Sequence, residues 1–371
     1  MTFVKSHVDS LCGYQGFYAG ARRCAGLEIP ESRCVVVNRR GTRMEGISEK
    51  LFRGVGFAPR FYQKLRALDP QLVHAHFGTS ALAALRISRK MKCPLIVTFH
   101  GRDATMTPAQ ARRSFRGRDL LRAKETIARE ATSIIAVSKF IRGRLLEAGY
   151  PQEKIVLHYN GVDTSAFSPD ASISREDSIL FVGRLVEKKG CIYLLQAMER
   201  IREKRPDISA IILGDGPDSE ELQSFSKQNR LNVEFLGFQP PEVVKSWMNR
   251  VKLLALPSVT ARDGDSEGLP TVLLEAQSMG LPVVGTRHSG IPEALVEGQT
   301  GYLVDERDSE SLADRLNTLL SNPERLISFG VNARAHVCDS FDLRRQTKKL
   351  ESLYDLVTDE ATKNVNFSAL A

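Results

Sequence analysis

Two glutamates, Glu267 and Glu275, have the residue type and spacing expected of a site that binds a polar ligand. Seven residues separate them within the segment SEGLPTVLLEA. The apolar run Val251–Leu256 before them predicts a buried strand. Pro270 suits the first residue of a helix, because its fixed φ is helical and its missing N–H costs nothing there. We therefore expect Glu267 in a loop just before a helix and Glu275 inside that helix.

The start of this predicted helix suits an anion. Free backbone N–H groups and the positive end of the helix dipole face the loop that holds Glu267, and both favour a phosphate group. Two carboxylates beside such a site are explained if each one binds a hydroxyl group. A nucleotide-sugar fits this arrangement, with its diphosphate on the amides, its ribose diol on one glutamate and its hexose hydroxyls on the other.

A second polar loop, Gly183–Gly190 (GRLVEKKG), lies between a predicted strand, Ser178–Val182, and a predicted helix, Gly190–Lys204. This position is the carboxyl end of a parallel sheet, where α/β folds bind their ligands. Arg184 and Lys189 flank the turn and can converge on a diphosphate, the arginine as a planar fork and the lysine as a point charge.

These motifs resemble those of a known family. The spacing of the two glutamates, and the segment Met279–Leu295 (MGLPVVGTRHSGIPEAL) that follows, resemble the retaining GT-B glycosyltransferases of family 4. The sequence DGDSEGLP…GTRHSGIPE is similar to that of the branch that builds bacterial exopolysaccharides of the colanic-acid and amylovoran type. The resemblance is specific from about Leu72 to Leu320. It implies an α/β chain with the GT-B fold: two Rossmann-like, doubly wound domains that face each other across a cleft, and a C-terminal helix that crosses back.

The resemblance also implies a role for each residue of the donor site. Arg184 and Lys189 would hold the donor phosphates and stabilise the leaving nucleoside diphosphate as the glycosidic bond breaks. Glu275 would hold the ribose diol. Glu267 would meet the hydroxyls of the transferred sugar, helped by nearby backbone amides. The other donor-site residues that we expect are Gly183, Gly268, Leu269, Pro270 and Thr271.

In the first half of the chain, the segment TFHGRD ends a predicted strand. The family has a functionally important histidine at this strand end. The resemblance therefore implies that His100 hydrogen-bonds the transferred sugar or positions the acceptor, with Gly101 and Asp103 on the acceptor side. Two further histidines, in LVHAHF, are interpreted as structural. We expect His74 and His76 to point to opposite faces of their strand.

The triplet Asp263–Gly264–Asp265 is the pattern with which another glycosyltransferase fold binds a divalent metal. The GT-B resemblance implies that arginine, lysine and helix amides bind the donor diphosphate in place of a metal. We therefore expect a metal-independent enzyme and a polar loop that lines the sugar pocket. The six cysteines show no metal-ligand spacing. No cofactor is expected, since the nucleotide-sugar donor is itself a substrate.

Length and composition favour two domains. A chain of 371 residues, 42% of them hydrophobic, is too long for one ordinary domain and can form two cores. Apolar strands that alternate with helices predict parallel sheets covered by helices on both faces. The sequence has no apolar run long enough to predict a membrane-spanning helix, and its N-terminus lacks a signal-peptide pattern. The scattered cysteines favour a reducing cytoplasm.

We place the acceptor-side Rossmann-like domain at residues 1–165 and the nucleotide-sugar-binding Rossmann-like domain at 166–338. A crossover helix at 339–357 and a frayed tail at 358–371 follow. The first domain of a GT-B enzyme normally opens with a strand, whereas this chain opens on what resembles the first helix. Either Met1 is a late start or the protein lacks this strand. The Arg/Gly-rich segment Arg39–Gly56 is predicted to be a loop or short linker.

Charge is unevenly distributed along the chain. Residues 1–165 hold 28 Lys and Arg against 13 Asp and Glu, a net charge of +15, whereas the remainder carries −7. Such asymmetry suggests that the first half meets an anionic partner: a membrane face, a lipid pyrophosphate or nucleic acid. No nucleic-acid-binding motif or stacking platform is present, so we expect no nucleic acid. The basic stretch Ala111–Arg129 favours electrostatic docking on an anionic membrane surface, with a solvated helix as the alternative.

The resulting hypothesis is a metal-independent retaining glycosyltransferase (hexosyltransferase). It would transfer a hexose from a nucleoside diphosphate sugar, UDP favoured over GDP, to a lipid-linked oligosaccharide in bacterial exopolysaccharide biosynthesis. It would work in the cytoplasm, or peripherally on the inner face of the plasma membrane. The alternatives are a GT-B transferase for a small soluble or lipid acceptor, and a non-catalytic nucleotide-sugar-binding subunit. The sequence leaves open the sugar, base, acceptor, linkage and oligomeric state.

Overall fold

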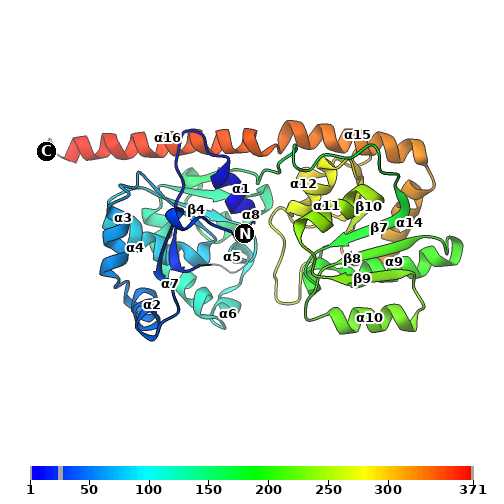
Figure 1. Cartoon of the computed structure of the whole chain (residues 1–371), viewed down its shortest axis with the longest axis horizontal. Coiled ribbons are helices and arrows are strands. Elements are labelled where there is room, and N and C mark those ends of the chain that lie inside the picture. The colour runs from blue at the N-terminus through cyan, green and yellow to red at the C-terminus, as the bar shows by residue number, and fades with distance from the viewer. Residues whose placement is uncertain (1, 24–27, 369–371) are drawn as a thin grey trace. The chain divides into compact units, whose positions relative to one another are not determined.

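The computed structural model describes residues 2–23 and 28–368, and the chain divides into two compact units (Figure 1). Unit 1 comprises Met1–Val137, Arg142–His158 and Arg344–Ala371, and unit 2 comprises Ser138–Ile141 and Tyr159–Leu343. Each unit has its own parallel sheet and its own core of buried apolar side chains. Among the described residues, no helix is both long and apolar enough to cross a membrane.

Unit 2 contains a six-stranded parallel sheet in the order β12-β11-β10-β7-β8-β9. Its strands are β7 (Glu176–Val182), β8 (Ser209–Leu213), β9 (Val233–Gly237), β10 (Val251–Leu256), β11 (Val283–Thr286) and β12 (Gly301–Val304). The chain builds outwards from β7 on one side and then from β10 on the other, and these two strands pair directly. The place between them is a topological switch point, beyond whose carboxyl ends doubly wound sheets bind ligands.

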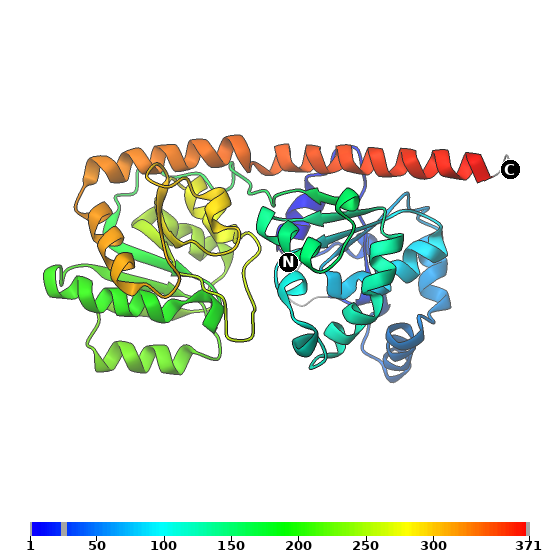
Figure 2. The same ribbon diagram turned by 180° about the vertical axis from the view of Figure 1, so that it is seen from behind.

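Helices cover both faces of this sheet (Figures 1 and 2). Successive residues of β7 point to opposite faces, so Ile179 and Phe181 belong to one buried cluster and Leu180 to the other. This is why the strand is apolar without alternation. The helices of the unit are α9 (Cys191–Lys204), α10 (Ser219–Gln228), α11 (Pro241–Arg250), α12 (Thr271–Ser278), α13 (Ile291–Ala294), α14 (Ser309–Leu320) and α15 (Pro323–Ser340).

Unit 1 is built around a four-stranded parallel sheet in the order β3-β4-β5-β6. Its strands are β3 (Val73–His76), β4 (Leu95–Phe99), β5 (Ser133–Ala136) and β6 (Ile155–Leu157), and a separate parallel pair consists of β1 (Tyr18–Arg22) and β2 (Cys34–Asn38). The helices that precede or connect them are α1 (Thr2–Asp9), α2 (Arg43–Val55), α3 (Pro59–Arg66), α4 (Ala81–Met91), α5 (Arg102–Thr105), α6 (Pro108–Ala111), α7 (Phe115–Glu130) and α8 (Lys139–Glu147). The helix predicted at the start of the chain is α1, the first described element.

The last helix, α16 (Leu343–Ser368), belongs to unit 1 from Arg344 onwards. Its residues Leu350 and Tyr354 form a buried cluster with Ile96 of β4 and Ile135 of β5. The tail expected from residue 358 starts within this helix, which continues to Ser368. No Gly or Pro lies between 358 and 368 to end it.

The segment Arg39–Gly56, predicted to be a loop, instead contains helix α2 (Arg43–Val55). The side chain of Thr42 caps the helix by accepting a hydrogen bond from the backbone nitrogen of Glu45 at 3.3 Å. At the other end Gly56 adopts a left-handed conformation, with φ of 74°, which is a common helix terminator. The prediction failed because the Arg and Gly content was read without these two caps.

Candidate active site

In unit 2, the loops after β7, β8 and β10 approach one another at backbone distance. A Cβ atom on Gly214 would lie 1.8 Å from the carbonyl oxygen of Gly183, and one on Gly190 would lie 1.9 Å from that of Pro257. Glycine is therefore required at both positions, and Gly190 also has a positive φ of 65°. This close approach brings the loop Gly183–Gly190 against the end of β10, from which the loop to Glu267 departs.

The result is a buried ion pair between the two motifs. Lys189, in the 3₁₀ turn Glu187–Lys189, places its Nζ 3.0 Å from Glu267 Oε1, with side chains 16% and 10% exposed. Burial alone would raise the pKa of Glu267, but the ammonium groups of Lys189 and then Lys188 hold it below its ordinary value. Glu267 Oε1 is buried and pairs with the Lys189 ammonium, but a carboxylate oxygen has a second lone pair, so a ligand hydroxyl can still bind to it.

Glu275 lies on α12, near the same lysine. Burial raises the pKa of its carboxyl to about 7, and Lys189 opposes this rise. The positive charge of Lys189 therefore acts on two carboxyl groups: Glu267, which is ionised, and Glu275, whose pKa is near neutral pH. Such a site favours a ligand that carries both phosphate charge and hydroxyl groups.

Two details of the α12 start differ from the expectation. Pro270 is the residue before the helix and has an extended backbone (φ −66°, ψ 119°), so α12 begins at Thr271 rather than at Pro270. The side chain of Leu269 is buried in the core of unit 2. Among Gly268, Leu269 and Pro270, only backbone atoms therefore remain for a ligand.

Arg184 lies in the same loop as Lys189 but does not join the ion pair. Its side chain is exposed, and within residues 2–23 and 28–368 it forms no ion pair. Gly183 lies against the stem of Lys189, since a Cβ on this glycine would be 3.4 Å from the lysine Cδ. The structure thus brings Lys189, Glu267 and Glu275 together and leaves Arg184 available at the rim.

The aspartates of the triplet Asp263–Gly264–Asp265 are engaged within the protein. Asp265 Oδ1 lies 3.1 Å from Lys188 Nζ, and Asp263 Oδ1 accepts a hydrogen bond from the backbone nitrogen of Asp265 at 3.0 Å. In the part of the chain that the structure describes, no group of three or more His, Cys, Asp or Glu has a metal-binding arrangement. Asp265 thus holds the loop to Lys188, and Asp263 fixes the turn that precedes it.

A histidine that the sequence analysis did not single out also belongs to this region. His288 follows β11, and its side chain is 1% exposed. It accepts a hydrogen bond from the backbone nitrogen of Glu267 at 3.2 Å and contacts Glu306 at 2.6 Å. Its place within GTRHSG of the family motif was the one available indication, since its partners lie 21 and 18 residues away.

In unit 1, His100 follows β4 and meets a second histidine. Its Nε2 lies 3.2 Å from Nδ1 of His76, while its Nδ1 is buried without a hydrogen-bond partner among the described residues. Burial, and then repulsion from His76, lower its pKa well below the ordinary value. The rings of Phe3 and Phe77 pack against it, at 4.8 and 4.6 Å between centroids. His100 is thus a neutral, hydrogen-bonding side chain.

The expectation that His74 and His76 face opposite sides of β3 is wrong. Residues two apart on a strand share a face, and the two rings stack with centroids 4.3 Å apart. His74 bonds Tyr354 of α16 through Nδ1 and Thr98 of β4 through Nε2, both at 2.7 Å. His74 therefore joins α16 to the sheet, whereas His76 reaches His100.

Asp103 and Gly101, expected on the acceptor side, form the turn after His100. The Asp103 carboxylate accepts hydrogen bonds from the backbone nitrogens of Gly78 (2.7 Å), Gly101 (3.0 Å) and His100 (3.1 Å). Burial raises the pKa of Asp103 although these bonds oppose the rise. Its carboxylate is thus occupied in holding the turn that presents His100.

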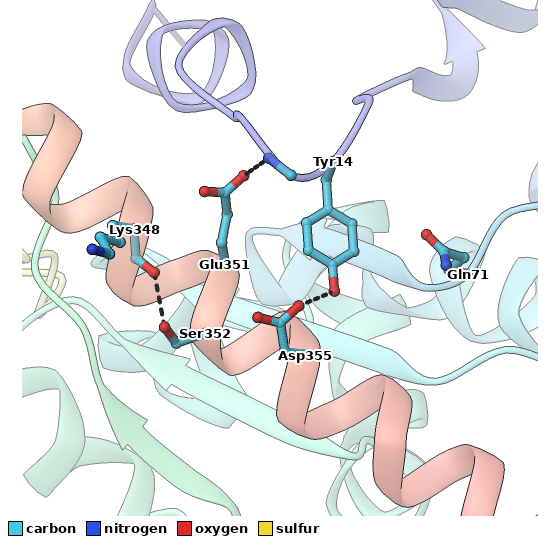
Figure 3. A pocket seen from close by; sticks show the side chains of 7 residues that line it. Tyr14, Gln71, Lys348, Glu351, Ser352 and Asp355 are labelled. Carbon is cyan, nitrogen blue, oxygen red and sulfur yellow. Dashed lines mark hydrogen bonds between the residues drawn. The ribbon is translucent and has the colours of Figure 1, made fainter.

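A separate surface pocket of about 440 Å³ lies in unit 1 between α16 and the segment after α1 (Figure 3). Glu351 accepts hydrogen bonds from the backbone nitrogens of Cys12 and Gly13 at 2.7 Å, and the Tyr14 hydroxyl donates to Asp355 at 2.7 Å. Both carboxylates are used to fasten the N-terminal segment to α16. We assign this pocket to the fold rather than to the reaction.

Both halves of the chain match known families. Residues 20–166 match the family described as Glycosyltransferase Family 4, and residues 165–336 match the family described as Glycosyl transferases group 1. WcaL of Escherichia coli (strain K12), named for colanic acid biosynthesis, is 32% identical over 290 residues, which cover 75% of this chain and 69% of WcaL. AmsK of Erwinia amylovora, an amylovoran biosynthesis glycosyltransferase, is 28% identical over 296 residues, which cover 78% of this chain and 70% of AmsK.

Among solved structures, HepE of Anabaena in complex with UDP and glucose matches with a TM-score of 0.72. The match covers 91% of this chain and 99% of HepE, at 21% sequence identity. A likeness at this identity establishes the fold, which is GT-B. Together with the relatives at about 30% identity, these matches show that the chain belongs to glycosyltransferase family 4, in the branch of the colanic-acid and amylovoran glycosyltransferases.

Proposed function

We propose that the protein is a retaining, metal-independent hexosyltransferase that uses a UDP-sugar and extends a lipid-linked oligosaccharide in exopolysaccharide biosynthesis. The observation that carries this proposal is the group formed by the buried Glu267 and the partly buried Lys189 and Glu275 at the switch point of the unit 2 sheet. A charged lysine that pairs with one carboxylate and acts on a second suits a diphosphate bonded to hydroxyl-bearing sugars.

In this proposal, each residue has one task. Lys189 and Arg184 bind the donor diphosphate, so that negative charge on the leaving group is stabilised as the glycosidic bond breaks. Glu275 accepts hydrogen bonds from the ribose diol, and Glu267 accepts them from the hexose. His100, kept neutral by burial, hydrogen-bonds a sugar or acceptor hydroxyl.

Retention of configuration follows if the acceptor attacks from the face on which the diphosphate leaves. The acceptor oxygen forms a bond to the anomeric carbon while the bond to the phosphate oxygen breaks. That phosphate oxygen then takes the acceptor proton, so no separate protein base is needed. UDP is favoured because HepE, which shares the fold, was solved with UDP and with UDP-glucose, and GDP is the alternative nucleotide.

Thermal unfolding of the protein with UDP, GDP, ADP or dTDP tests the donor site. A nucleotide at about 100 times its Kd stabilises the native state by about 2.7 kcal/mol. We expect UDP to raise the Tm and EDTA to leave that rise unchanged. Glu275→Ala should remove most of the rise, whereas Arg184→Ala should reduce turnover more than UDP binding. A response to none of the nucleotides would contradict the proposal.

We further propose that the enzyme works in the cytoplasm at the inner face of the membrane, through an apolar stripe on α2. Met44, Ile47, Leu51 and Val55 recur at helical spacing and are 73, 48, 43 and 73% exposed. Basic residues of the same helix, Arg43 and Lys50, are exposed and lie along one side of this stripe. An apolar stripe with a basic flank is typical of helices that lie in an anionic membrane surface.

Helix α7, expected from its charge to dock on the membrane, offers no such stripe. Its residues Leu120, Ala123 and Ile127 are buried in the core, and its exposed side chains are mainly arginines, with Phe115 and Glu125 among them. It can strengthen attraction to anionic lipids, by about 1 kcal/mol for each basic residue near the surface. Insertion is therefore assigned to α2.

Flotation with anionic vesicles (phosphatidylglycerol in phosphatidylcholine) tests this assignment. The protein should float with them, and Leu51→Glu with Val55→Glu should reduce the floating fraction severalfold. Val331→Glu is a matched control, because Val331 is an apolar residue of α15 that is 65% exposed. If the protein does not float, the alternative of a small soluble acceptor is favoured, and if the control variant loses binding equally, the assignment to α2 is wrong.

A further inference from the structure

A buried polar chain runs from Glu306 through His288 to the backbone of Glu267. Nδ1 of His288 lies 2.6 Å from Glu306 Oε1, and its Nε2 lies 3.2 Å from the backbone nitrogen of Glu267. The hydroxyl of Ser289 lies 3.0 Å from the same Nε2. Both His288 and Glu267 are buried, at 2% and 8% exposure.

The contact with Glu267 determines which nitrogen of His288 carries the proton. A backbone N–H can only donate, so Nε2 must be the bare nitrogen that accepts. Nδ1 then carries the proton and donates to the Glu306 carboxylate. Burial lowers the pKa of His288 although Glu306 opposes this, which favours the neutral ring that the arrangement requires.

Glu306 also holds the other end of the same loop. The backbone nitrogen of Thr260 donates to Glu306 Oε2 at 2.8 Å, and the Thr260 hydroxyl donates to Oε1 at 3.1 Å. The loop from Thr260 to Glu267 is therefore fixed at its start by Glu306 directly and at its end through His288. One carboxylate thus sets the position of the whole loop.

We propose that His288 and Glu306 are positioning residues that orient Glu267 towards the hydroxyls of the donor sugar. The proposal rests on the function proposed above, in which Glu267 binds the sugar. Neither residue needs to touch the substrate. Their effect follows because the Glu267 carboxylate lies at the end of the loop that they hold, and a loop shift would move its oxygens away from a sugar hydroxyl.

This arrangement separates sugar binding from nucleotide binding. The backbone of Lys189 is held by its own loop, through the close approach of Gly190 to Pro257, although its Nζ reaches Glu267, and Glu275 belongs to helix α12. Neither His288 nor Glu306 bonds these groups. A loss of the His288 contact is therefore expected to weaken the recognition of the hexose and to spare that of UDP.

Isothermal titration of the full-length protein tests this separation. UDP is compared with UDP-glucose, UDP-galactose and UDP-N-acetylglucosamine, and the sugar nucleotide that the wild type binds best is used throughout. For His288→Leu we expect the ratio of the Kd for the UDP-sugar to the Kd for UDP to rise about tenfold to a hundredfold, the range for a lost hydrogen bond to a charged group. The Kd for UDP should change less than twofold.

Three further variants make the result specific. His288→Gln can still accept from the Glu267 N–H and should recover part of the ratio. Glu306→Gln keeps an oxygen that accepts from His288, but its amide NH₂ group faces the Thr260 N–H, so both groups there are donors. Its ratio should lie between those of the wild type and His288→Leu. His336→Leu, on α15 of the same unit, is the matched control and should leave both Kd values unchanged. In Glu267→Gln, adding His288→Leu should change the ratio less than threefold, because both act through one hydrogen bond.

The outcomes distinguish the two proposals. A wild type that binds neither UDP nor any UDP-sugar contradicts the proposed function itself. A wild type that binds UDP, combined with a His288→Leu variant that loses UDP and UDP-sugar equally or loses neither, overturns the positioning role. If His288→Leu does not fold, Glu306→Gln and His288→Gln decide in the same way, since both retain a polar side chain of similar size.

Discussion

The two units differ in the charge of their partly or fully buried polar groups, which are paired charges in unit 2 and neutral histidines in unit 1. In unit 2, Lys189 pairs with Glu267 at 3.0 Å and also opposes the rise in the pKa of Glu275, so opposite charges compensate one another. Unit 1 instead holds a group of histidines that burial, and for several of them mutual repulsion, keeps neutral. The pKa of each is lowered from its ordinary value; these residues are His7, His74, His76, His100 and His158.

This difference indicates a division of work between the units. A charged lysine can meet the phosphates of a nucleotide-sugar, and its carboxylate partners can turn to hydroxyl groups when the ligand arrives. Neutral histidines can donate or accept hydrogen bonds with hydroxyls without attracting the diphosphate. We therefore expect donor charge to be handled in unit 2 and uncharged hydroxyl contacts in unit 1.

The largest expected effect is acid destabilisation of unit 1. Burial lowers the pKa of His7 to about 3 and that of His76 to about 4, from 6.5. The unfolded chain then binds more protons than the folded one below pH 6.5, so stability present above that pH is lost as the pH falls. At pH 5 each of these two histidines costs about 2 kcal/mol relative to pH 8.

The stability of unit 2 should change less with pH. The lowered pKa values of His288 and His336 make this unit less stable in acid, whereas the raised pKa of Glu275 makes it more stable in acid. Trp247, the single tryptophan, lies on α11 of unit 2 and reports that unit by fluorescence. Between pH 8 and pH 5, urea unfolding followed by circular dichroism should develop an early phase that tryptophan fluorescence lacks. Equal shifts in both signals would remove the contrast between the units.

The next effect concerns the fixed charge of unit 2. Lys189→Met should lower kcat by about 10²–10³, the range for losing one charge-stabilising group in a transition state. Lys188→Met is the control, because Lys188 pairs with Asp265 at 3.1 Å and not with Glu267, and it should cost less than tenfold. Steady-state turnover of the UDP-sugar measures both. Similar losses in the two variants would mean that general loop charge, rather than the Lys189 pair, matters.

The smallest effect is on stability and comes from Glu275. The folded state binds the extra proton between about pH 4.5 and 7, because burial raises this pKa to about 7. Stability is therefore lost as the pH rises through this window. Glu275→Gln should stabilise unit 2 by about 2–3 kcal/mol at pH 8 and much less at pH 5. Glu324→Gln, at an exposed site of α15, controls for the change of net charge; a pH-independent gain for Glu275→Gln would argue against a buried, titrating carboxyl.

Much of the fold could be predicted because its causes are local. The strands of both sheets are short apolar runs, and Val251–Leu256 was predicted with the bounds that the structure has. Ser138, just before α8, accepts a hydrogen bond from Ile141 N at 3.1 Å, a contact within one helical turn. Helix α2 was not predicted although its caps, Thr42 and Gly56, are also local, because an Arg- and Gly-rich composition is typical of a loop.

The site was predicted in part for the same reason. The GRLVEKKG loop and the two glutamates are each continuous motifs, so their residue types and their places at helix starts follow from the sequence. The contact between the two motifs does not follow from the sequence, since Lys189 and Glu267 come together only because β7 and β10 are neighbours in the sheet. Arg184, from the same motif as Lys189, remains outside the ion pair and exposed.

The sequence alone therefore determined which segments form strands and helices, which residues carry charge, and which family the motifs resemble. Only the tertiary structure decided that Tyr354 bonds His74 across 280 residues, that His76 faces His100, and that Glu306 holds Glu267 through His288. Local preferences act over one or two helical turns, whereas these contacts depend on strand order and on which loops end at the same sheet edge.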